Sequence, residues 1–237
     1  MLMPAPYPQT AVILAMSADG KIADGGRSPA RFGSAADQAH LEAQVALADV
    51  VVFGAETLRA YGTTMSVRSP ELLAQRQACG QSSQPVQLVC SASGRLDPEA
   101  RFFRQPVPRW LLTTATGAQL WRQTHFDQIL IAPQVGEKWD WRAVWRSLAG
   151  AGLARVAVLG GGRLTSALFE AGLVQDLWLT ICPLVLGGAT APTPVDGVGF
   201  WAKSAPQLHL QSAEQLGGEL FLNYRVKMPD RGALTSL

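Results

Sequence analysis

The sequence is poor in the residues that build metal sites and disulfide frameworks. Its 237 residues include three cysteines and three histidines, and neither set is clustered. Cys79, Cys90 and Cys182 form no CxxC pair and show no disulfide-like spacing, which excludes a disulfide scaffold and favours a reducing compartment. Zinc sites draw on grouped Cys or His ligands, so the sequence predicts no metal site.

Long apolar runs and a strong charge bias are also missing. No apolar stretch reaches the ~18 residues that a membrane span needs. The Pro-rich start has no positive charge before an apolar run, as a signal peptide would have. The net charge is only +2, and no dense Lys/Arg stripe suggests nucleic acid. We therefore expect a cytoplasmic globular protein that binds neither membranes nor nucleic acid.

Short apolar runs instead alternate with helical patterns. The expected strands are 12–16, 50–53, 86–90, 109–113, 129–131, 156–159 and 177–181. The expected helices are 37–47, 70–79, 116–122, 139–149 and a segment that runs from the glycines at 160–162 to residue 171. The clearest helix is 139–149, where Trp141, Val144, Trp145 and Leu148 share one face.

The C-terminal part has a different pattern, because two alternating apolar runs flank Gly217-Gly218, as in a β-hairpin. The whole pattern predicts an α/β fold with a mostly parallel mixed sheet, flanking helices and a C-terminal antiparallel hairpin. No linker divides the chain, so we expect a single domain over 1–237, with flexible tails at 1–9 and 229–237.

Three glycines end one buried strand, and a helix follows at once. Gly160, Gly161 and Gly162 let the backbone turn sharply and leave room for a ligand. The helix N-terminus adds free N–H groups and a partial positive charge, which together favour a pyrophosphate. A plain strand-to-helix turn remains the alternative, since Leu164 and Thr165 do not complete a G-x-G-x-x-G fingerprint and no P-loop lysine follows.

Four blocks in order carry a family resemblance. They are residues 15–23 (AMSADGKIA), 54–60 (GAETLRA), 158–173 (VLGGGRLTSALFEAGL) and 173–188 (LVQDLWLTICPLVLGG). Together they resemble the reductase domain of the bifunctional riboflavin deaminase-reductases, over roughly residues 12–226. The zinc signature of the deaminase domain is absent, so the chain is most similar to the stand-alone reductases. The resemblance implies a dihydrofolate-reductase-like fold and, as in the family, a homodimer.

The resemblance also implies an activity and a cofactor. In that family NADPH reduces the ribose ring of 5-amino-6-(5-phosphoribosylamino)uracil to a ribityl chain. Carried over residue by residue, the diphosphate would contact Gly160, Gly161, Gly162, Arg163 and Leu164. The nicotinamide half would contact Gly54, Ala55 and Thr57. Ser91, with Arg95, would face the adenosine side, where its donors suit the 2′-phosphate of NADPH.

The substrate side is implied by the same blocks. Asp19 is the candidate catalytic residue, with Lys21 or a bound water as other proton sources. Asp19-Gly20 is also a common turn dipeptide. The residues expected to bind substrate are Lys21, Ser34, Tyr61 and Arg68, of which Lys21 and Arg68 would hold its phosphate.

Three positions depart from the family pattern. Arg31 stands where the family has an aromatic residue, Val45 where it has an arginine, and Tyr61 where it has an acid. Several family substrate contacts are therefore missing while the cofactor blocks remain. This leaves two alternatives open, namely a reductase of dihydrofolate or another small heterocycle on the same fold, and a catalytically silent nucleotide-binding protein.

Overall fold

The structure is a computed structural model that describes residues 7–121 and 125–227. The first half of the chain forms β1 (Gln9–Ser17), α1 (Ala35–Leu47), β2 (Val50–Gly54), α2 (Ala55–Tyr61), α3 (Pro70–Ala78), β3 (Val86–Cys90), the short 3-10 helix η1 (Arg101–Arg104), β4 (Arg109–Thr113) and α4 (Ala115–Ala118). The second half forms β5 (Gln128–Ile131), β6 (Gln134–Val135), β7 (Lys138–Trp139), α5 (Trp141–Gly150), β8 (Arg155–Val158), α6 (Gly162–Glu170), β9 (Asp176–Cys182), β10 (Gln207–Leu216) and β11 (Glu219–Lys227).

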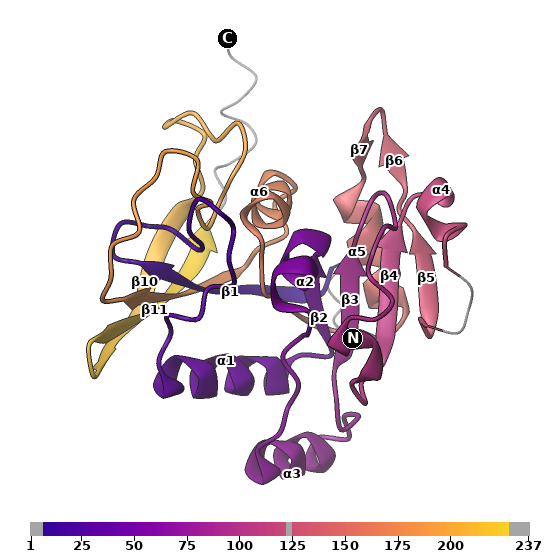
Figure 1. The fold of residues 1–237 in the computed structure, drawn as a ribbon, viewed down its shortest axis with the longest axis horizontal. Helices are drawn as coiled ribbons and strands as arrows, with labels where there is room; N and C mark the ends of the chain where they lie inside the picture. Colours follow the sequence, from indigo (N-terminus) through magenta and orange to yellow (C-terminus); the bar gives the residue numbers. More distant parts are fainter. Residues whose placement is uncertain (1–6, 122–124, 228–237) are drawn as a thin grey trace, which may run out of the picture.

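Nine strands form one mixed sheet in the order β10-β11-β9-β1-β8-β2-β3-β4-β5. Neighbouring strands from β9 to β5 are parallel, whereas β11 pairs antiparallel with both β9 and β10. The mostly parallel sheet with a C-terminal antiparallel hairpin is thus confirmed. Figure 1 shows the hairpin at one end of the sheet and β5 at the other.

Alternating side chains of the central strands fill two cores, one on each face of the sheet. On one face, Val12 and Val52 pack with Trp145 of α5 and Leu168 of α6. On the other face, strand residues such as Phe53 pack with the buried side of α1 and with η1. A parallel sheet covered on both faces explains why the central strands are almost uniformly apolar. None of the described helices is long and apolar enough to span a membrane.

Several element boundaries differ from the sequence prediction. Helix α5 begins at Trp141 because the Asp140 side chain accepts a hydrogen bond from the backbone N–H of Ala143, at 3.0 Å. Trp139, expected in that helix, instead pairs with Gln134 in the small β6–β7 hairpin. The segment expected to form a helix over 116–122 forms only α4, and its last residue lies outside the described part.

Two further differences concern the expected tails of the chain and helix α2. Gln9, expected in the N-terminal tail, is the first residue of β1, whereas residues 1–6 and 228–237 of the expected tails lie outside the described residues. Helix α2 was not predicted, because seven residues between Gly54 and Gly62 are too short to show a helical period. Gly62 ends α2 with a φ of 65°, which favours glycine.

The strand order changes direction around β8. This strand comes late in the chain, yet it lies between β1 and β2. Its carboxyl end therefore brings the glycine turn beside the end of β2, where Gly54 donates a backbone hydrogen bond to the carbonyl of Gly160 at 3.0 Å. Ligands of open α/β sheets bind at such switch points, outside the carboxyl ends of the strands.

Candidate functional site

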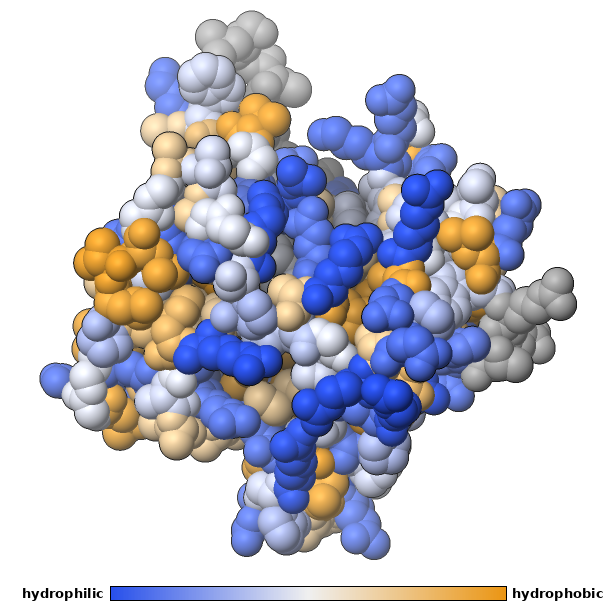
Figure 2. Space-filling model, viewed as in Figure 1, coloured by the Kyte–Doolittle hydropathy of each residue, from blue (hydrophilic) through white to orange (hydrophobic). Residues whose placement is uncertain are grey.

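A cavity of about 450 Å³ opens at this junction. Its size is typical of small-molecule sites. Its walls come from the ends of β1, β2 and β8, from α1, α2 and the start of α6, and from the loop after β1. The residues predicted for the site that line the cavity are Gly54, Thr57, Tyr61, Arg68, Gly160, Gly161, Gly162, Arg163 and Leu164. Figure 2 shows hydrophilic side chains around a hollow near the centre of this face.

The glycine turn is a backbone cradle. Gly160 has a φ of 97°, which favours glycine, and the Gly160–Gly161 peptide bond is cis. A Cβ at Gly162 would overlap the carbonyl oxygen of Thr193. A Cβ at Gly161 would meet only the Thr57 hydroxyl oxygen, at 3.7 Å. Helix α6 starts here without a side-chain cap, so its first N–H groups remain available for a diphosphate.

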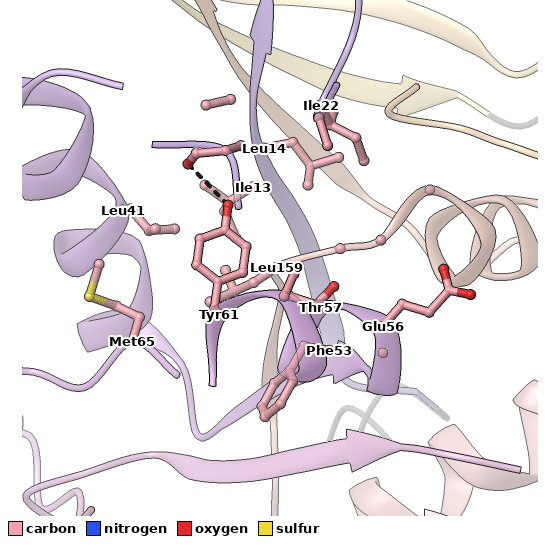
Figure 3. A pocket seen from close by; sticks show the side chains of 18 of the residues that line it. Ile13, Leu14, Ile22, Leu41, Phe53, Glu56, Thr57, Tyr61, Met65 and Leu159 are labelled. Atoms are coloured by element: carbon pink, nitrogen blue, oxygen red, sulfur yellow. Dashed lines mark hydrogen bonds between the residues drawn. The ribbon is translucent and has the colours of Figure 1, made fainter. Parts of the chain in front are cut away.

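Helix α2 supplies the facing wall of this cradle. Thr57 lines the cavity opposite Gly161, whereas Ala55 is buried beneath it and does not line the cavity. Figure 3 shows Thr57 and Tyr61 on α2, with Leu41 of α1 to the side of the Tyr61 ring. The turn and α2 thus face one another across the cavity.

Ser91 lies away from this cavity. It directly follows β3, is 4% exposed, and donates its backbone N–H to the carbonyl of Leu112 at 3.0 Å. Nearby, the Arg59 guanidinium of α2 donates to the carbonyl oxygen of Arg95 at 3.3 Å. The loop after β3 and α2 therefore adjoin one another, and both arginines are exposed there.

Asp19 is held by hydrogen bonds that oppose the predicted catalytic role. Its carboxylate accepts from the Ser17 hydroxyl at 2.6 Å and from the backbone N–H groups of Leu186 and Gly187 at 3.0 and 2.7 Å. These contacts, that of Ser17 most of all, lower the pKa of Asp19 to about 2. An acid that is ionised throughout the physiological range is a poor proton donor. Asp19 does not line the cavity, and it ties the turn after β1 to the segment after β9.

Lys21 and Ser34, which were predicted to bind substrate, do not line this cavity. The Lys21 ammonium donates to the carbonyl of Ala191 at 3.4 Å. Ser34 is the N-cap of α1, and its hydroxyl donates to Oε2 of Glu219 at 2.5 Å. Both side chains thus form hydrogen bonds to other groups of the protein.

Tyr61 and Arg68 lie where the prediction puts them. The Tyr61 hydroxyl donates to the carbonyl of Ala30 at 3.0 Å, as the dashed line in Figure 3 shows. Burial raises the pKa of Tyr61, so the phenol stays protonated at neutral pH. The backbone N–H of Arg68 donates to Oε1 of Glu42 at 2.6 Å, and its exposed side chain lies at the cavity wall.

The three departures from the family pattern have different structural outcomes. Val45 is fully buried in the core behind α1, so no cation could occupy that position without a partner. Arg31 is exposed and does not line the cavity. Only Tyr61 changes the chemistry of the cavity wall itself.

The sequence reasoning missed several wall residues. Arg27 lines the mouth and forms an ion pair with Glu56, with Nη1 and Oε2 2.9 Å apart. Asp37 and Leu41 line the cavity from α1. The one available signal for Asp37 was the spacing Ser34-x-x-Asp37 at the start of the helix.

The described residues contain no group of three or more His, Cys, Asp or Glu side chains that could hold a metal ion. The cavity combines the glycine cradle, largely apolar walls and a few polar side chains. Such a combination is typical of small-molecule sites.

Comparisons with known proteins agree with this architecture. Residues 8–222 match the RibD C-terminal domain family. The 2,5-diamino-6-ribosylamino-4(3H)-pyrimidinone 5′-phosphate reductase of Archaeoglobus fulgidus is 28% identical over 211 residues, which cover 89% of this chain and 94% of that protein. A pyrimidine reductase-like protein from Corynebacterium diphtheriae superimposes with a TM-score of 0.79 at 22% identity, covering 94% of this chain and 93% of that one.

Dihydrofolate reductase from Enterococcus faecalis superimposes with a TM-score of 0.52 at 11% identity, over 93% of this chain and 99% of that one. The predicted dihydrofolate-reductase-like α/β fold is thereby confirmed. Because the family match extends over most of the sequence, the chain belongs to the RibD C-terminal domain family, the pyrimidine reductases of riboflavin biosynthesis.

Proposed function

We propose that this protein is an NADPH-dependent reductase that converts a ribosylamino-pyrimidine 5′-phosphate into its ribitylamino product. The substrate expected from the sequence is 5-amino-6-(5-phosphoribosylamino)uracil. One observation carries the proposal: the glycine cradle and the wall formed by Tyr61 and Arg68 meet in a single cavity, in a chain of this family. Cofactor and substrate can therefore lie side by side, as hydride transfer requires.

The cradle supports NADPH as the cofactor, which supplies the hydride when bound. The first N–H groups of α6, which no side chain caps, would hold the diphosphate. Gly54, Ala55 and Thr57 would orient the nicotinamide carboxamide, with Ala55 acting through its backbone. The exposed Arg59 and Arg95, beside Ser91, favour the 2′-phosphate of NADPH over NADH.

The reaction adds one hydride and one proton to the substrate. The hydride attaches to C1′ of the ribose, the bond from C1′ to the ring oxygen breaks, and that oxygen takes the proton. Ile13, Phe53 and Leu159 line the cavity with apolar surface, which limits water around the reacting carbon. Arg68 would bind the 5′-phosphate. Water supplies the proton in this proposal, since Asp19 and Lys21 are engaged elsewhere.

The direct test mixes purified protein with NADPH and a panel of ribosylamino-pyrimidine phosphates and dihydrofolate, and follows oxidation of the nicotinamide by absorbance. We expect oxidation with a ribosylamino-pyrimidine phosphate. Turnover of dihydrofolate alone would move the assignment to the small-heterocycle alternative. NADPH binding without oxidation by any candidate would favour the silent binding protein.

We also propose that the protein is a homodimer. All ten residues of the edge strand β10 are exposed, and Leu208 and Leu210 are 42% and 54% exposed. Figure 2 shows hydrophobic side chains on the side of the molecule where Figure 1 labels the hairpin. An uncovered apolar edge strand is a ready pairing surface for a second copy. Light scattering on the wild-type protein should give twice the mass of one chain, and Leu210→Lys should lower the measured mass to that of the monomer. A monomeric wild-type protein would contradict the proposal.

A further inference from the structure

One ion pair at the mouth of the cavity has no part in the function proposed above. Arg27 belongs to the loop after β1, and Glu56 stands in the first turn of α2; both residues line the cavity. Their side chains are 48% and 56% exposed. An ion pair this exposed contributes little to stability, because solvent screens its charges. The pair can therefore open easily when a stronger partner for one of the charges enters the cavity.

The backbone at Arg27 has a conformation that suits glycine. Its φ is 58°, and it is the one residue other than glycine with a positive φ among residues 7–121 and 125–227. Two hydrogen bonds of 3.0 Å fix the turn, because the N–H groups of Arg27 and Ser28 donate to the carbonyl and to Oδ1 of Asp24. A glycine would adopt this turn with less strain, so the turn itself does not need the arginine side chain. Strain of this kind is typical of ligand clamps.

Glu56 holds the arginine beside the glycine cradle. Figure 3 shows Glu56 next to Thr57, at the end of α2 away from Tyr61. A Cβ at Gly161 would lie 3.7 Å from the Thr57 hydroxyl oxygen, so this end of α2 faces the cradle. The guanidinium that pairs with Glu56 is therefore on the cradle side of the cavity mouth.

The loop that carries Arg27 is also joined to the cradle through the backbone. The N–H of Ile22 donates to the carbonyl of Pro192 at 2.9 Å, which ties the loop after β1 to the segment between β9 and β10. That segment in turn reaches the start of α6, where the N–H of Asp196 donates to the carbonyl of Gly162 at 3.1 Å. Two hydrogen bonds thus connect the strained loop with the turn that would hold a diphosphate.

The charges beside the cradle are balanced while the ion pair is closed. Asp196 lines the cavity there, and its Oδ2 is 2.8 Å from a Cβ placed on Gly162. Arg163 is exposed and also lines the cavity. A diphosphate adds two negative charges and therefore favours a further charge-assisted donor. Arg27 can supply it, since Glu56 is half exposed and stays hydrated when the guanidinium leaves.

We propose that Arg27 binds the diphosphate of the cofactor by exchanging partners, so that its guanidinium leaves Glu56 and donates to diphosphate oxygens when a dinucleotide binds. The planar fork of guanidinium donors matches phosphate oxygens. This inference rests on the proposed function. It adds to the backbone N–H groups of α6 a side chain from the loop after β1, on the other side of the diphosphate.

Two fragments of NADP⁺ test the contact without turnover. 2′-Phospho-ADP-ribose retains the diphosphate, whereas 2′-AMP retains only the adenosine and its 2′-phosphate. Arg27→Gly accepts the positive φ, so the turn should persist. In calorimetry this variant should bind 2′-phospho-ADP-ribose about tenfold more weakly and 2′-AMP as the wild type does. Arg27→Lys should lose less, because it keeps the charge without the fork. Arg31→Ala, which removes an exposed arginine of the same loop outside the cavity wall, should change neither affinity.

Glu56→Gln separates an exchange of partners from a purely structural ion pair. If the pair only holds the loop in place, loss of either member should weaken binding alike. The exchange predicts opposite results, because Glu56→Gln frees Arg27 and removes an acid. This variant should bind 2′-phospho-ADP-ribose at least as tightly as the wild type, and up to about threefold more tightly. Weaker binding in Glu56→Gln, no loss in Arg27→Gly, or an equal loss on 2′-AMP would overturn the inference.

Turnover distinguishes this inference from the proposed function. Binding of 2′-phospho-ADP-ribose that depends on Arg27, without NADPH oxidation by any pyrimidine, would support the inference and contradict the proposed function. Oxidation of NADPH with the same KM for NADPH in the wild type and Arg27→Gly would do the reverse. A wild-type protein that binds neither 2′-phospho-ADP-ribose nor NADPH would overturn both.

Discussion

The two halves of the cavity are built in different ways. The half that we propose to bind the cofactor, the cofactor half, is mostly backbone, because Gly160, Gly161 and Gly162 turn between a strand and a helix, and Gly54 bonds to the same turn. The substrate half is mostly side chains, which α1, α2 and the loops around them contribute. A backbone cradle tolerates changes in its neighbours, whereas a wall of side chains changes its specificity with each substitution. We therefore expect substitutions to change the recognition of the substrate more readily than that of the cofactor.

The largest expected effect comes from filling the backbone cradle. Gly161→Val places a side chain in the space opposite Thr57, where the nearest protein atom to the new Cβ is 3.7 Å away. The fold should persist, while NADPH affinity should fall roughly 10- to 100-fold, as expected for about 1–3 kcal/mol of steric conflict with the ligand. Calorimetry measures the affinity, and Gly150→Val, in open space on α5, is the matched control. Unchanged affinity would show that the turn is only structural.

On the substrate side, removing a phosphate ligand should have the next largest effect. Arg68→Ala should raise KM for the phosphorylated substrate about tenfold, with a smaller change in kcat, because a charge-assisted contact is lost equally from ground and transition states. NADPH affinity should stay the same, since the cradle is built elsewhere. Steady-state kinetics on phosphorylated and dephosphorylated substrates provide the comparison. A similar loss on both would mean that Arg68 does not bind the phosphate.

Tyr61→Phe should act more weakly on the same half. The change removes the hydrogen bond to the carbonyl of Ala30 and keeps the ring in place. One such bond contributes about 1 kcal/mol, so KM for the pyrimidine should rise about fivefold through a looser loop at residue 30. The NADPH dissociation constant serves as the internal control. A larger effect on NADPH than on the pyrimidine would contradict the division into two halves.

Asp19→Asn should have the smallest effect on catalysis. Loss of a general acid costs about 10²–10⁴-fold in rate, whereas a residue that only ties two loops together should change kcat less than about twofold. Stability provides the second readout. The folded pKa is about 2 and the ordinary value 3.8, so the stabilisation by Asp19 is present above pH 3.8 and is lost as the pH falls through 2. The melting temperatures of the wild-type protein and of Asp19→Asn should converge over that pH range. A large loss of kcat in Asp19→Asn would instead support Asp19 as the catalytic residue.

The sequence could predict the cofactor half because its signals are local. The strand, the three glycines and the helix are contiguous, and Thr57 follows its own strand directly. The parallel sheet and the terminal hairpin follow from periodicity alone. The position of β8 between β1 and β2 has no local signal, yet it is what brings Gly160 to Gly54.

The substrate half depends on pairings between distant residues. The Ser34 N–H donates to the carboxylate of Glu219, 185 residues away. Asp19 is engaged by backbone N–H groups 167 and 168 residues away. Neither pairing leaves a pattern in a single sequence. The sequence could therefore not show that Asp19, Lys21 and Ser34 lie outside the cavity wall, whereas the contiguous glycines do line it.

The most direct measurement of the central claim is the NADPH oxidation assay with ribosylamino-pyrimidine 5′-phosphates, combined with mass spectrometry of the product. The account predicts one NADPH oxidised for each substrate molecule that gains two hydrogen atoms. No oxidation with any of these pyrimidines, while dihydrofolate is consumed or NADPH is bound and left unreacted, would contradict it.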